Sequence, residues 1–364
     1  MAEDSAKEPE VSVLVPIYNV ERYLRTCLES LRMQTFKDFE VICINDGSTD
    51  GSRAIIQEFL DVDPRFRAID KDNSGYGASM NRGLREARGR YVAILESDDF
   101  FELDALARLH EASVAAKADV VKANFWLYWS CPEERRELFR AVDARETAGI
   151  FAPLDDVALF FRKPSIWSAL YGRSFLERNG IWFLETPGAS YQDAGFNFKV
   201  WACARRVACL ETPVLCYRQD NEASSVNSPS KVFCVCDEYE SMDKFLDGLD
   251  LSAGDLRKLR GILTRMKLDS YLWNYDRLSA ELRAEFLKRA AQELKADLDA
   301  GRVDLALFKP WAEADLRALI KDPETFAKCR TEYAAPGKLN TFKHYYRIGG
   351  MPLIAKLLKN KVAK

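Results

Sequence analysis

The first hundred residues alternate between short apolar runs and longer segments whose apolar residues recur at helical spacing. The apolar runs are residues 11–18, 40–45, 66–69 and 91–95. Their continuity is typical of strands buried on both faces of a parallel sheet. Between the first two runs, residues 20–33 place Leu24, Leu28 and Leu31 on one helix face. The pattern repeats at about 25 residues and predicts an α/β fold with a doubly wound, mostly parallel sheet.

Each apolar run ends in polar or glycine residues. Asn19 follows the first run and is expected to cap the next helix, residues 45–52 follow the second, and residues 73–77 follow the third. In such sheets the C-terminal strand ends share one edge, where ligands bind, and a phosphate-bearing nucleotide is the expected ligand. The chain has neither a G-x-G-x-x-G fingerprint after the first strand nor a Walker A lysine. A metal ion is therefore expected to meet the phosphate charge.

The fourth run ends in three carboxylates within four residues, Glu96, Asp98 and Asp99. Negative charge at the end of a buried strand needs a neutralising partner, and hard divalent cations take oxygen ligands. The alternative is a solvated turn in which Asp99 caps a helix expected over residues 103–117. Together with the other strand ends, the pattern favours a Mn²⁺ or Mg²⁺ site.

Four segments resemble the family 2 glycosyltransferases in order and spacing. They are residues 15–19, 45–52, 73–83 and 96–99. The resemblance is strong from residue 11 to about residue 127 and resumes over residues 166–228. It implies a GT-A fold that binds a nucleotide-sugar.

The resemblance also implies roles for individual residues. The residues expected to line the base pocket or border the nucleoside are Pro16, Tyr18, Asn19, Asp46, Ser48, Asn73, Gly75 and Asn81. Within this set, Asp46 is expected to accept a hydrogen bond from the base. The family's D-x-D motif falls on Glu96, Ser97 and Asp98, so Asp98 is expected to ligate the metal. Glu96 is longer than the usual Asp and is expected to reach the ribose or a metal-bound water.

The catalytic base is expected on the segment around residue 193. An inverting transfer needs a carboxylate that removes the proton of the acceptor hydroxyl. The family's Glu-Asp pair corresponds to Gln192 and Asp193 here, which assigns the base to Asp193; the alternative is that Asp193 only caps a helix over residues 196–204. Arg218 is expected to offset charge on the leaving group, or else to be a structural arginine in a surface loop.

Composition sets the domain organisation and the compartment. The chain has 364 residues, 48% of them hydrophobic, and we expect a catalytic domain over residues 1–230 and a helical extension over residues 231–364. Nine cysteines without metal-ligand spacing, a charged N-terminus and no long apolar stretch predict a cytoplasmic protein with reduced thiols. The net charge of −3 gives no case for nucleic-acid binding.

Helical periodicity runs from about residue 232 and predicts four or five helices, with Ser279 as an N-cap and Gly301 as a stop. This extension could pack on the catalytic domain, form a homodimer or bind a partner. Residues 333–364 contain seven Lys or Arg and no acidic residue. Such a tail fits peripheral contact with anionic lipid on the inner face of the plasma membrane, or else a solvated basic tail.

The sequence thus predicts an inverting, metal-dependent glycosyltransferase. It would move a sugar from a nucleotide-diphosphate donor, most simply a UDP-sugar, to a glycan or lipid-linked acceptor in cell-surface polysaccharide synthesis. A catalytically weak nucleotide-sugar-binding or scaffolding subunit is the alternative, supported by Glu96 and Gln192 in place of the usual Asp and Glu. A nucleotidyltransferase would need a basic, Gly-rich loop after the first strand, and residues 15–19 offer none.

Overall fold

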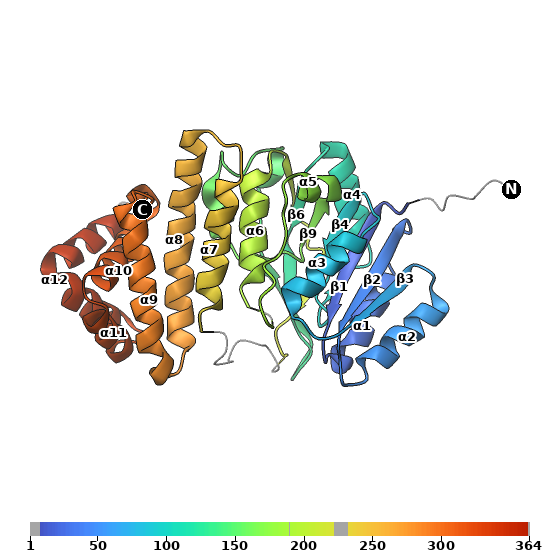
Figure 1. Ribbon diagram of the computed structural model, residues 1–364, viewed down its shortest axis with the longest axis horizontal. Coiled ribbons are helices and arrows are strands. Elements are labelled where there is room, and N and C mark those ends of the chain that lie inside the picture. The colour runs from blue at the N-terminus through green and yellow to red at the C-terminus, as the bar shows by residue number, and fades with distance from the viewer. Residues whose placement is uncertain (1–7, 189, 222–231, 363–364) are drawn as a thin grey trace. The chain divides into compact units, whose positions relative to one another are not determined.

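The computed structural model describes residues 8–188, 190–221 and 232–362. It divides into two compact units, Met1–Ser225 and Val226–Lys364, which are coloured blue to green and yellow to red in Figure 1. The first unit is a mixed α/β unit and the second is helical, which confirms the predicted fold class.

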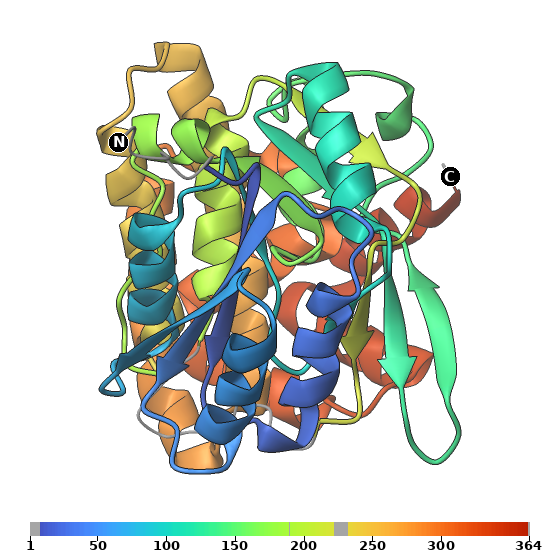
Figure 2. The ribbon, with the colours of Figure 1, turned by 90° about the vertical axis from the view of Figure 1, so that its right-hand side faces the viewer.

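The first unit contains two sheets. The larger has the strand order β10-β6-β9-β4-β1-β2-β3, and the smaller has the order β5-β11-β7-β8. The strands are β1 Val11–Ile17, β2 Phe39–Asp46, β3 Phe66–Lys71, β4 Tyr91–Ile94, β5 Phe100–Phe101, β6 Val120–Ala123, β7 Phe125–Trp129, β8 Arg135–Phe139, β9 Ala169–Gly172, β10 Val207–Leu210 and β11 Leu215–Arg218. In the larger sheet only β9 runs antiparallel, to β4 and to β6. The antiparallel β7–β8 pair is the long green hairpin in Figure 2.

The helices of the first unit follow the predicted periodicity. They are α1 Glu21–Arg32, α2 Ser52–Val62, α3 Tyr76–Glu86, α4 Ala105–Ala116, α5 Arg173–Arg178 and α6 Gln192–Cys203, with short 3₁₀ turns η1 Glu146–Ala148 and η2 Val157–Phe161. The predicted apolar face of α1 is buried completely, at Leu24, Cys27, Leu28 and Leu31. On α3, Gly83 leaves room for Leu14 of β1 and Ile44 of β2.

Two predicted helix caps differ from the structure. Asn19 does not cap α1; its side-chain oxygen accepts a hydrogen bond from the Thr49 N–H at 2.8 Å, and Asp50 accepts one from the first residue of α1, Glu21. Asp99 does not cap α4, because β5 intervenes and α4 begins only at residue 105. For α1, a residue from the loop after β2 replaces the local cap, which spacing along the chain does not reveal.

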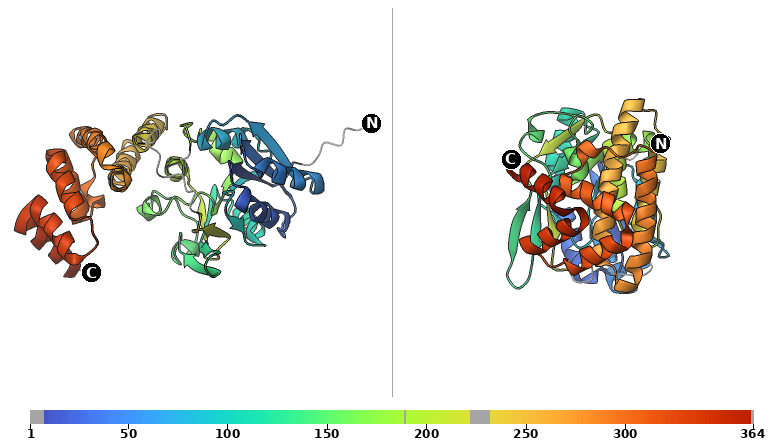
Figure 3. Two further views of the ribbon diagram at one scale, coloured as in Figure 1. Left: turned by 90° about the horizontal axis from the view of Figure 1, so that it is seen from below. Right: turned by 90° about the vertical axis from the view of Figure 1, so that its left-hand side faces the viewer.

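The second unit has more helices than the four or five predicted. In its described part the α-helices are α7 Cys234–Asp247, α8 Ala253–Arg277, α9 Ala280–Asp299, α10 Pro310–Lys321, α11 Pro323–Glu332 and α12 Lys338–Val362, shown from two further directions in Figure 3. Ser279 and Gly301 do bound α9, as predicted. The helix α12 is kinked at Gly350, which has a φ of 62°, just before Pro352. Among the described residues, none of these helices combines the length and apolarity needed to cross a bilayer.

A buried carboxylate ties three strands of the sheet to the loop before β4. Glu40 on β2 accepts hydrogen bonds from Ser12 of β1 at 2.7 Å, from Arg67 of β3 at 2.8 Å and from Arg88 at 2.7 Å. Burial alone would raise the pKa of Glu40, but its bonds to Arg88, Arg67 and Ser12 outweigh that effect and lower the pKa to about 2.

Replacing Glu40 should therefore destabilise the sheet. We expect Glu40→Gln to lower the free energy of unfolding by about 2 kcal/mol, because two arginines lose their charged acceptor. Since the folded pKa lies below the ordinary 4.5, the contribution of Glu40 is present above pH 4.5 and is lost as the pH falls towards 2. Urea unfolding at several pH values tests both effects. Glu58→Gln, which breaks only an exposed pair with Arg25, is the matched control and should leave the free energy of unfolding nearly unchanged.

Candidate functional site

The strands carry the predicted site residues to one edge of the larger sheet. Parallel pairing aligns Ile17 with Asn45 and Leu14 with Ile94, so the segments that begin at Tyr18, Asp46 and Leu95 leave the sheet side by side. This is the edge at which ligands bind in open α/β sheets.

Asp46 organises the loop after β3. Its carboxylate accepts hydrogen bonds from the Lys71 ammonium, from the Ser74 N–H at 2.9 Å and from the Gly75 N–H at 3.0 Å. Only 5% of Asp46 is exposed, so contact with a base stays a prediction that would use its remaining lone pair. Lys71 was not anticipated from the sequence, because its partner lies 25 positions away.

The remaining nucleotide-binding candidates divide into exposed and buried groups. Tyr18 is 52% exposed at the end of β1, and Asn73 is also exposed, whereas Pro16 is buried within the strand. Ser48 accepts a hydrogen bond from the Asn19 N–H at 3.2 Å. Tyr18 therefore offers a free ring face for a base, and Ser48 and Asn19 hold the loop beside it.

Gly75 and Asn81 hold the loop before α6 against α3. A Cβ on Gly75 would meet the backbone of Thr186 and Gly188 at 2.8 Å. Asn81 is 2% exposed and binds Phe183 through both its amide nitrogen and its oxygen. This loop leads to Asp193, so both residues act on the site indirectly. Their expected position beside a nucleoside stays a prediction.

At the end of β4, Glu96 is paired with a tyrosine. Tyr76, the first residue of α3, donates a hydrogen bond to Glu96 at 2.6 Å. Burial raises the pKa of Glu96 to about 8, with smaller contributions from the charges of Asp98 and Asp193. Tyr76 also links Glu96 to the segment before α6, because its backbone N–H donates to the carbonyl of Gly188 at 3.0 Å. Tyr76 was not anticipated, although its position after Gly75 was part of the family motif.

Asp98 and Asp99 follow in a turn that a distant strand holds in place. Asp98 accepts a hydrogen bond from Asn221 at 2.8 Å and keeps an oxygen that no described residue contacts. Asp99 is fully buried and accepts a hydrogen bond from the backbone N–H of Arg218 at 2.8 Å. Burial, and then the charge of Asp98, raise the pKa of Asp99 well above its usual range. The solvated-turn alternative is therefore wrong for Asp99.

Arg218 is buried as well, at 8% exposure. Its guanidinium donates to the carbonyl of Asp98 at 3.0 Å and to Ser130 at 3.0 Å, and it lies 4.6 Å from the ring centroid of Tyr23. It is thus a structural arginine of the Asp98–Asp99 turn, not one in a surface loop. Direct contact with a leaving group stays a prediction.

The side chains at this turn suit a metal ion that takes most of its ligands from phosphate and water. In the described part of the chain, no three His, Cys, Asp or Glu residues cluster as a complete metal site. Asp98 is a partly exposed carboxylate with a free oxygen, and Ser97 lies beside it. Mg²⁺ and Mn²⁺ are commonly held by one or two carboxylates together with substrate phosphates and water. Asp98 fits that arrangement.

Asp193 lies in the first turn of α6 and does not cap it. The N-cap is Tyr191, whose backbone is left-handed at φ 60°, an uncommon state for a non-glycine residue. Gln192 anchors the preceding loop by accepting from the Ser190 N–H and donating to Thr186 at 2.9 Å. Burial raises the pKa of Asp193 to about 6, and its bond from Ala194 and the charge of Lys163 partly oppose that shift. A carboxylate with this pKa is suited to accept protons near neutral pH.

The comparisons with known proteins agree with this geometry. Residues 12–184 match the family model described as Glycosyl transferase family 2. Residues 12–184 are thus similar to the family 2 glycosyltransferases. EpsH of Bacillus subtilis is 36% identical over 217 residues, which are 58% of this chain and 61% of EpsH. The glycosyltransferase GlyA of Streptococcus pneumoniae is 31% identical over 222 residues, which are 58% of this chain and 31% of GlyA. The chain therefore spans less than two thirds of these relatives' lengths.

A solved structure shows the same fold over nearly the whole chain. TarS 1–349 of S. aureus, in complex with UDP-GlcNAc, superposes with a TM-score of 0.68 at 20% identity. The match covers 89% of this chain and 92% of that one, and it confirms the predicted GT-A fold together with a C-terminal helical region.

The structure also groups Lys163, which belongs to none of the motifs, with two aromatic residues. Lys163 follows η2, Trp167 precedes β9, and Tyr217 lies on β11. The charges of Asp99, Asp98, Glu96 and Asp193 all raise the pKa of Tyr217, although burial is the largest cause. Aromatic and basic residues between motifs are common in protein cores, so only their three-dimensional grouping assigns them to the site.

Proposed function

We propose that the protein is an inverting, metal-dependent glycosyltransferase that uses a nucleotide-diphosphate sugar, most simply a UDP-sugar. Its acceptor would be a hydroxyl of a glycan or lipid-linked saccharide in cell-surface polysaccharide synthesis. The observation that carries the proposal is that Tyr76 joins the two parts of the site: its hydroxyl donates to Glu96 at 2.6 Å, and its backbone N–H donates to the carbonyl of Gly188 at 3.0 Å, in the segment that leads to Asp193. We expect the carboxylates after β4 on the diphosphate side and Asp193 on the acceptor side.

In this mechanism Asp193 is the general base. Its carboxylate takes the proton of the acceptor hydroxyl while the hydroxyl oxygen attacks the anomeric carbon of the donor sugar. The bond between that carbon and the phosphate oxygen breaks, its electron pair leaves with the diphosphate, and the configuration inverts. Tyr191 and Gln192 fix the position of the base, and Tyr76 fixes Glu96 on the donor side.

Asp98 would hold the divalent cation, which when bound offsets the negative charge of the diphosphate. The complex of the structural neighbour TarS with UDP-GlcNAc supports a uridine nucleotide. The name and activity of that protein do not transfer by fold alone, so the donor sugar is a matter for experiment.

The alternative is a nucleotide-sugar-binding subunit with weak catalysis. Its support was the presence of Glu96 and Gln192 in place of the family's Asp and Glu. In the structure the amide of Gln192 has a structural role, because it donates to Thr186 and accepts from the Ser190 N–H. The two functions are distinguished by slow hydrolysis of a UDP-sugar in the presence of Mn²⁺, which only the transferase should show.

We also propose that α12 contacts an anionic membrane surface. Its exposed apolar residues include Leu339, Phe342 and Tyr346, at 65%, 43% and 50% exposure. They recur at helical spacing beside Lys343, within the tail that lacks acidic residues. A homodimer through the helical unit stays a prediction without a supporting contact.

The metal role of Asp98 predicts a specific loss. Asp98→Ala should weaken Mn²⁺-dependent binding of UDP at least about tenfold, because the cation loses its protein carboxylate. Binding without Mn²⁺ should be unchanged. Calorimetry with and without the metal measures both, and Asp104→Ala, an exposed aspartate that begins α4, is the control. Equal Mn²⁺-dependent affinity in mutant and wild type would remove Asp98 from the site.

The base role of Asp193 predicts lower activity and higher stability in one variant. Asp193→Asn should reduce kcat by about 10²–10⁴-fold with little change in donor affinity. The wild-type kcat should fall about tenfold per unit below pH 6, as the base becomes protonated.

The stability of the same variant separates a base from a helix cap. The folded pKa of Asp193 is raised from 3.8 to about 6, so its ionised form destabilises the fold above pH 6. Asp193→Asn should then raise the free energy of unfolding at pH 8 by about 1–3 kcal/mol and have no such effect below pH 4. A variant that is active, or less stable at pH 8, would indicate a capping role.

Membrane contact is tested on the exposed face of α12. The combined substitution Leu339→Asn, Phe342→Asn and Lys343→Gln should abolish sedimentation with vesicles of phosphatidylglycerol, and salt should weaken the binding of the wild type. Leu305→Asn, at a partly exposed leucine elsewhere in the unit, is the control. Salt-insensitive binding that is equal in all three proteins would leave the solvated tail as the correct interpretation.

A further inference from the structure

Lys163 places an ammonium group over an aromatic surface in the site. Its Nζ lies 4.1 Å from the ring centroid of Tyr217 and 5.8 Å from those of Trp167 and Phe139. Among the residues that the structure describes, no carboxylate lies within ion-pair distance of it. A lysine held by rings alone retains its donors for a ligand.

The aromatic surface beneath Lys163 contains a second unused donor. Trp167 and Tyr217 stack with ring centroids 4.9 Å apart and planes inclined by 23°. Trp167 is only 6% exposed, and its indole N–H has no hydrogen-bond partner in the described part of the chain. A buried donor left unpaired is costly, and a ligand oxygen would satisfy it.

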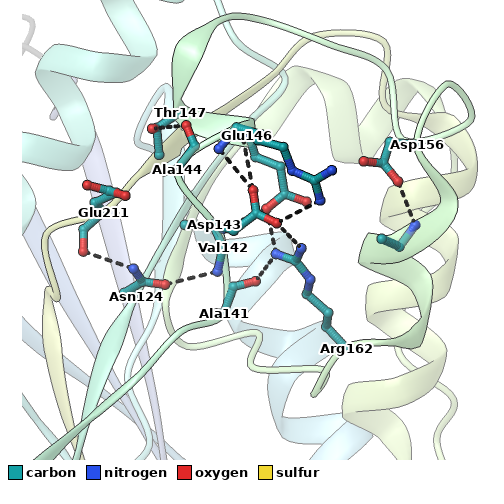
Figure 4. A network of polar contacts seen from close by, with 12 residues as sticks. Asn124, Ala141, Val142, Asp143, Ala144, Glu146, Thr147, Asp156, Arg162 and Glu211 are labelled. Carbon is teal, nitrogen blue, oxygen red and sulfur yellow. Dashed lines mark hydrogen bonds and ion pairs between the residues drawn. The ribbon is translucent and has the colours of Figure 1, made fainter. Parts of the chain in front are cut away.

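The backbone on both sides of Lys163 is fixed by polar contacts. Arg162 donates to the carbonyl of Ala141 at 2.8 Å and pairs with Glu146 and Asp143 (Figure 4). On the other side, Ser165 accepts hydrogen bonds from the buried ammonium of Lys122, through both its hydroxyl and its carbonyl oxygen. Lys163 thus extends from a rigid segment, as binding residues require.

The charges that act on Lys163 support a position on the acceptor side of the site. Burial lowers the pKa of Lys163, while Asp193 and then Asp99 favour its charged form. Asp193 is therefore the carboxylate that Lys163 senses most strongly, whereas Asp98 marks the diphosphate side.

We propose that Lys163, together with the indole N–H of Trp167, binds an anionic group of the acceptor next to the hydroxyl that Asp193 activates. The acceptor would then be a phosphate- or carboxylate-bearing glycan. That the bound anion belongs to an acceptor rests on the proposed transferase function. The anion-binding site itself rests only on the residues that the structure describes.

The test uses a small phosphate probe on the full chain with its donor side filled. Protein saturated with UDP and Mn²⁺ is titrated with glycerol 3-phosphate and, as the neutral match, with glycerol. Lys163→Met keeps the apolar stem over Tyr217 and removes the charge, so it should weaken glycerol 3-phosphate binding about tenfold or more. Lys163→Arg should largely restore it, and Trp167→Phe should weaken it severalfold. The affinity for UDP should not change in any variant.

Each other result would overturn the inference. Weaker UDP binding by Lys163→Met, with unchanged glycerol 3-phosphate binding, would assign Lys163 to the donor diphosphate. No phosphate-dependent binding by the wild type, or equal binding by all variants, would show that Lys163 only packs on Tyr217. Thermal melts show whether each variant is folded. If Lys163→Met does not fold, the binding of glycerol 3-phosphate by Lys163→Arg and Trp167→Phe tests the inference. Because the readout is binding, a wild type that transfers no sugar would refute the proposed function without touching this result.

Discussion

The burial of negative charge at the end of β4 is the constraint on which the site depends. Glu96, Asp98 and Asp99 lie within four positions after a buried strand. Burial, and then the charge of Asp98, raise the pKa values of Glu96 and Asp99. The fold stabilises this arrangement with a separate partner for each carboxylate: Tyr76 for Glu96, Asn221 for Asp98 and the backbone of Arg218 for Asp99. These partners come from α3, from the segment after β11 and from β11 itself, so the charged turn determines how three distant parts of the unit meet.

The burial of these carboxylates also explains why buried residues around the site hold its backbone in place. The side chain of Arg218 holds the carbonyl of Asp98, and its backbone holds the carboxylate of Asp99. Asn81 and Gly75 do the corresponding work for the segment that leads to Asp193. A site that must keep several carboxylates partly dehydrated needs its second layer to be rigid, because any slack would admit water and relax the shifted pKa values.

Local pattern was enough to predict the sheet and the edge at which the site lies. Continuous apolar runs located β1 to β4, and the helical face of α1 was read directly from Leu24, Cys27, Leu28 and Leu31. Contacts between distant segments could not be read in this way. The partner of Asn81 lies 102 positions away, Lys163 belongs to no motif, and Asn19 is diverted from capping α1 by Thr49. The predicted number of helices in the second unit was too low for a different reason. Pro310 and Pro323 each begin a new helix, whereas the apolar periodicity continues across these positions.

Contacts in the folded chain explain the two departures from the family's acidic pairs, Glu96 and Gln192. Read along the chain, Glu96 and Gln192 suggest a weakened catalyst. In the structure, Glu96 is long enough to accept the hydroxyl of Tyr76, and Gln192 supplies a donor and an acceptor to the loop before the base. Gln192 also removes one negative charge from the neighbourhood of Asp193. A second ionised carboxylate there would raise the pKa of Asp193 further and leave it protonated at neutral pH. If Asp193 is the base that we propose, Gln192 would thus keep its carboxylate ionised near neutral pH, as proton abstraction requires.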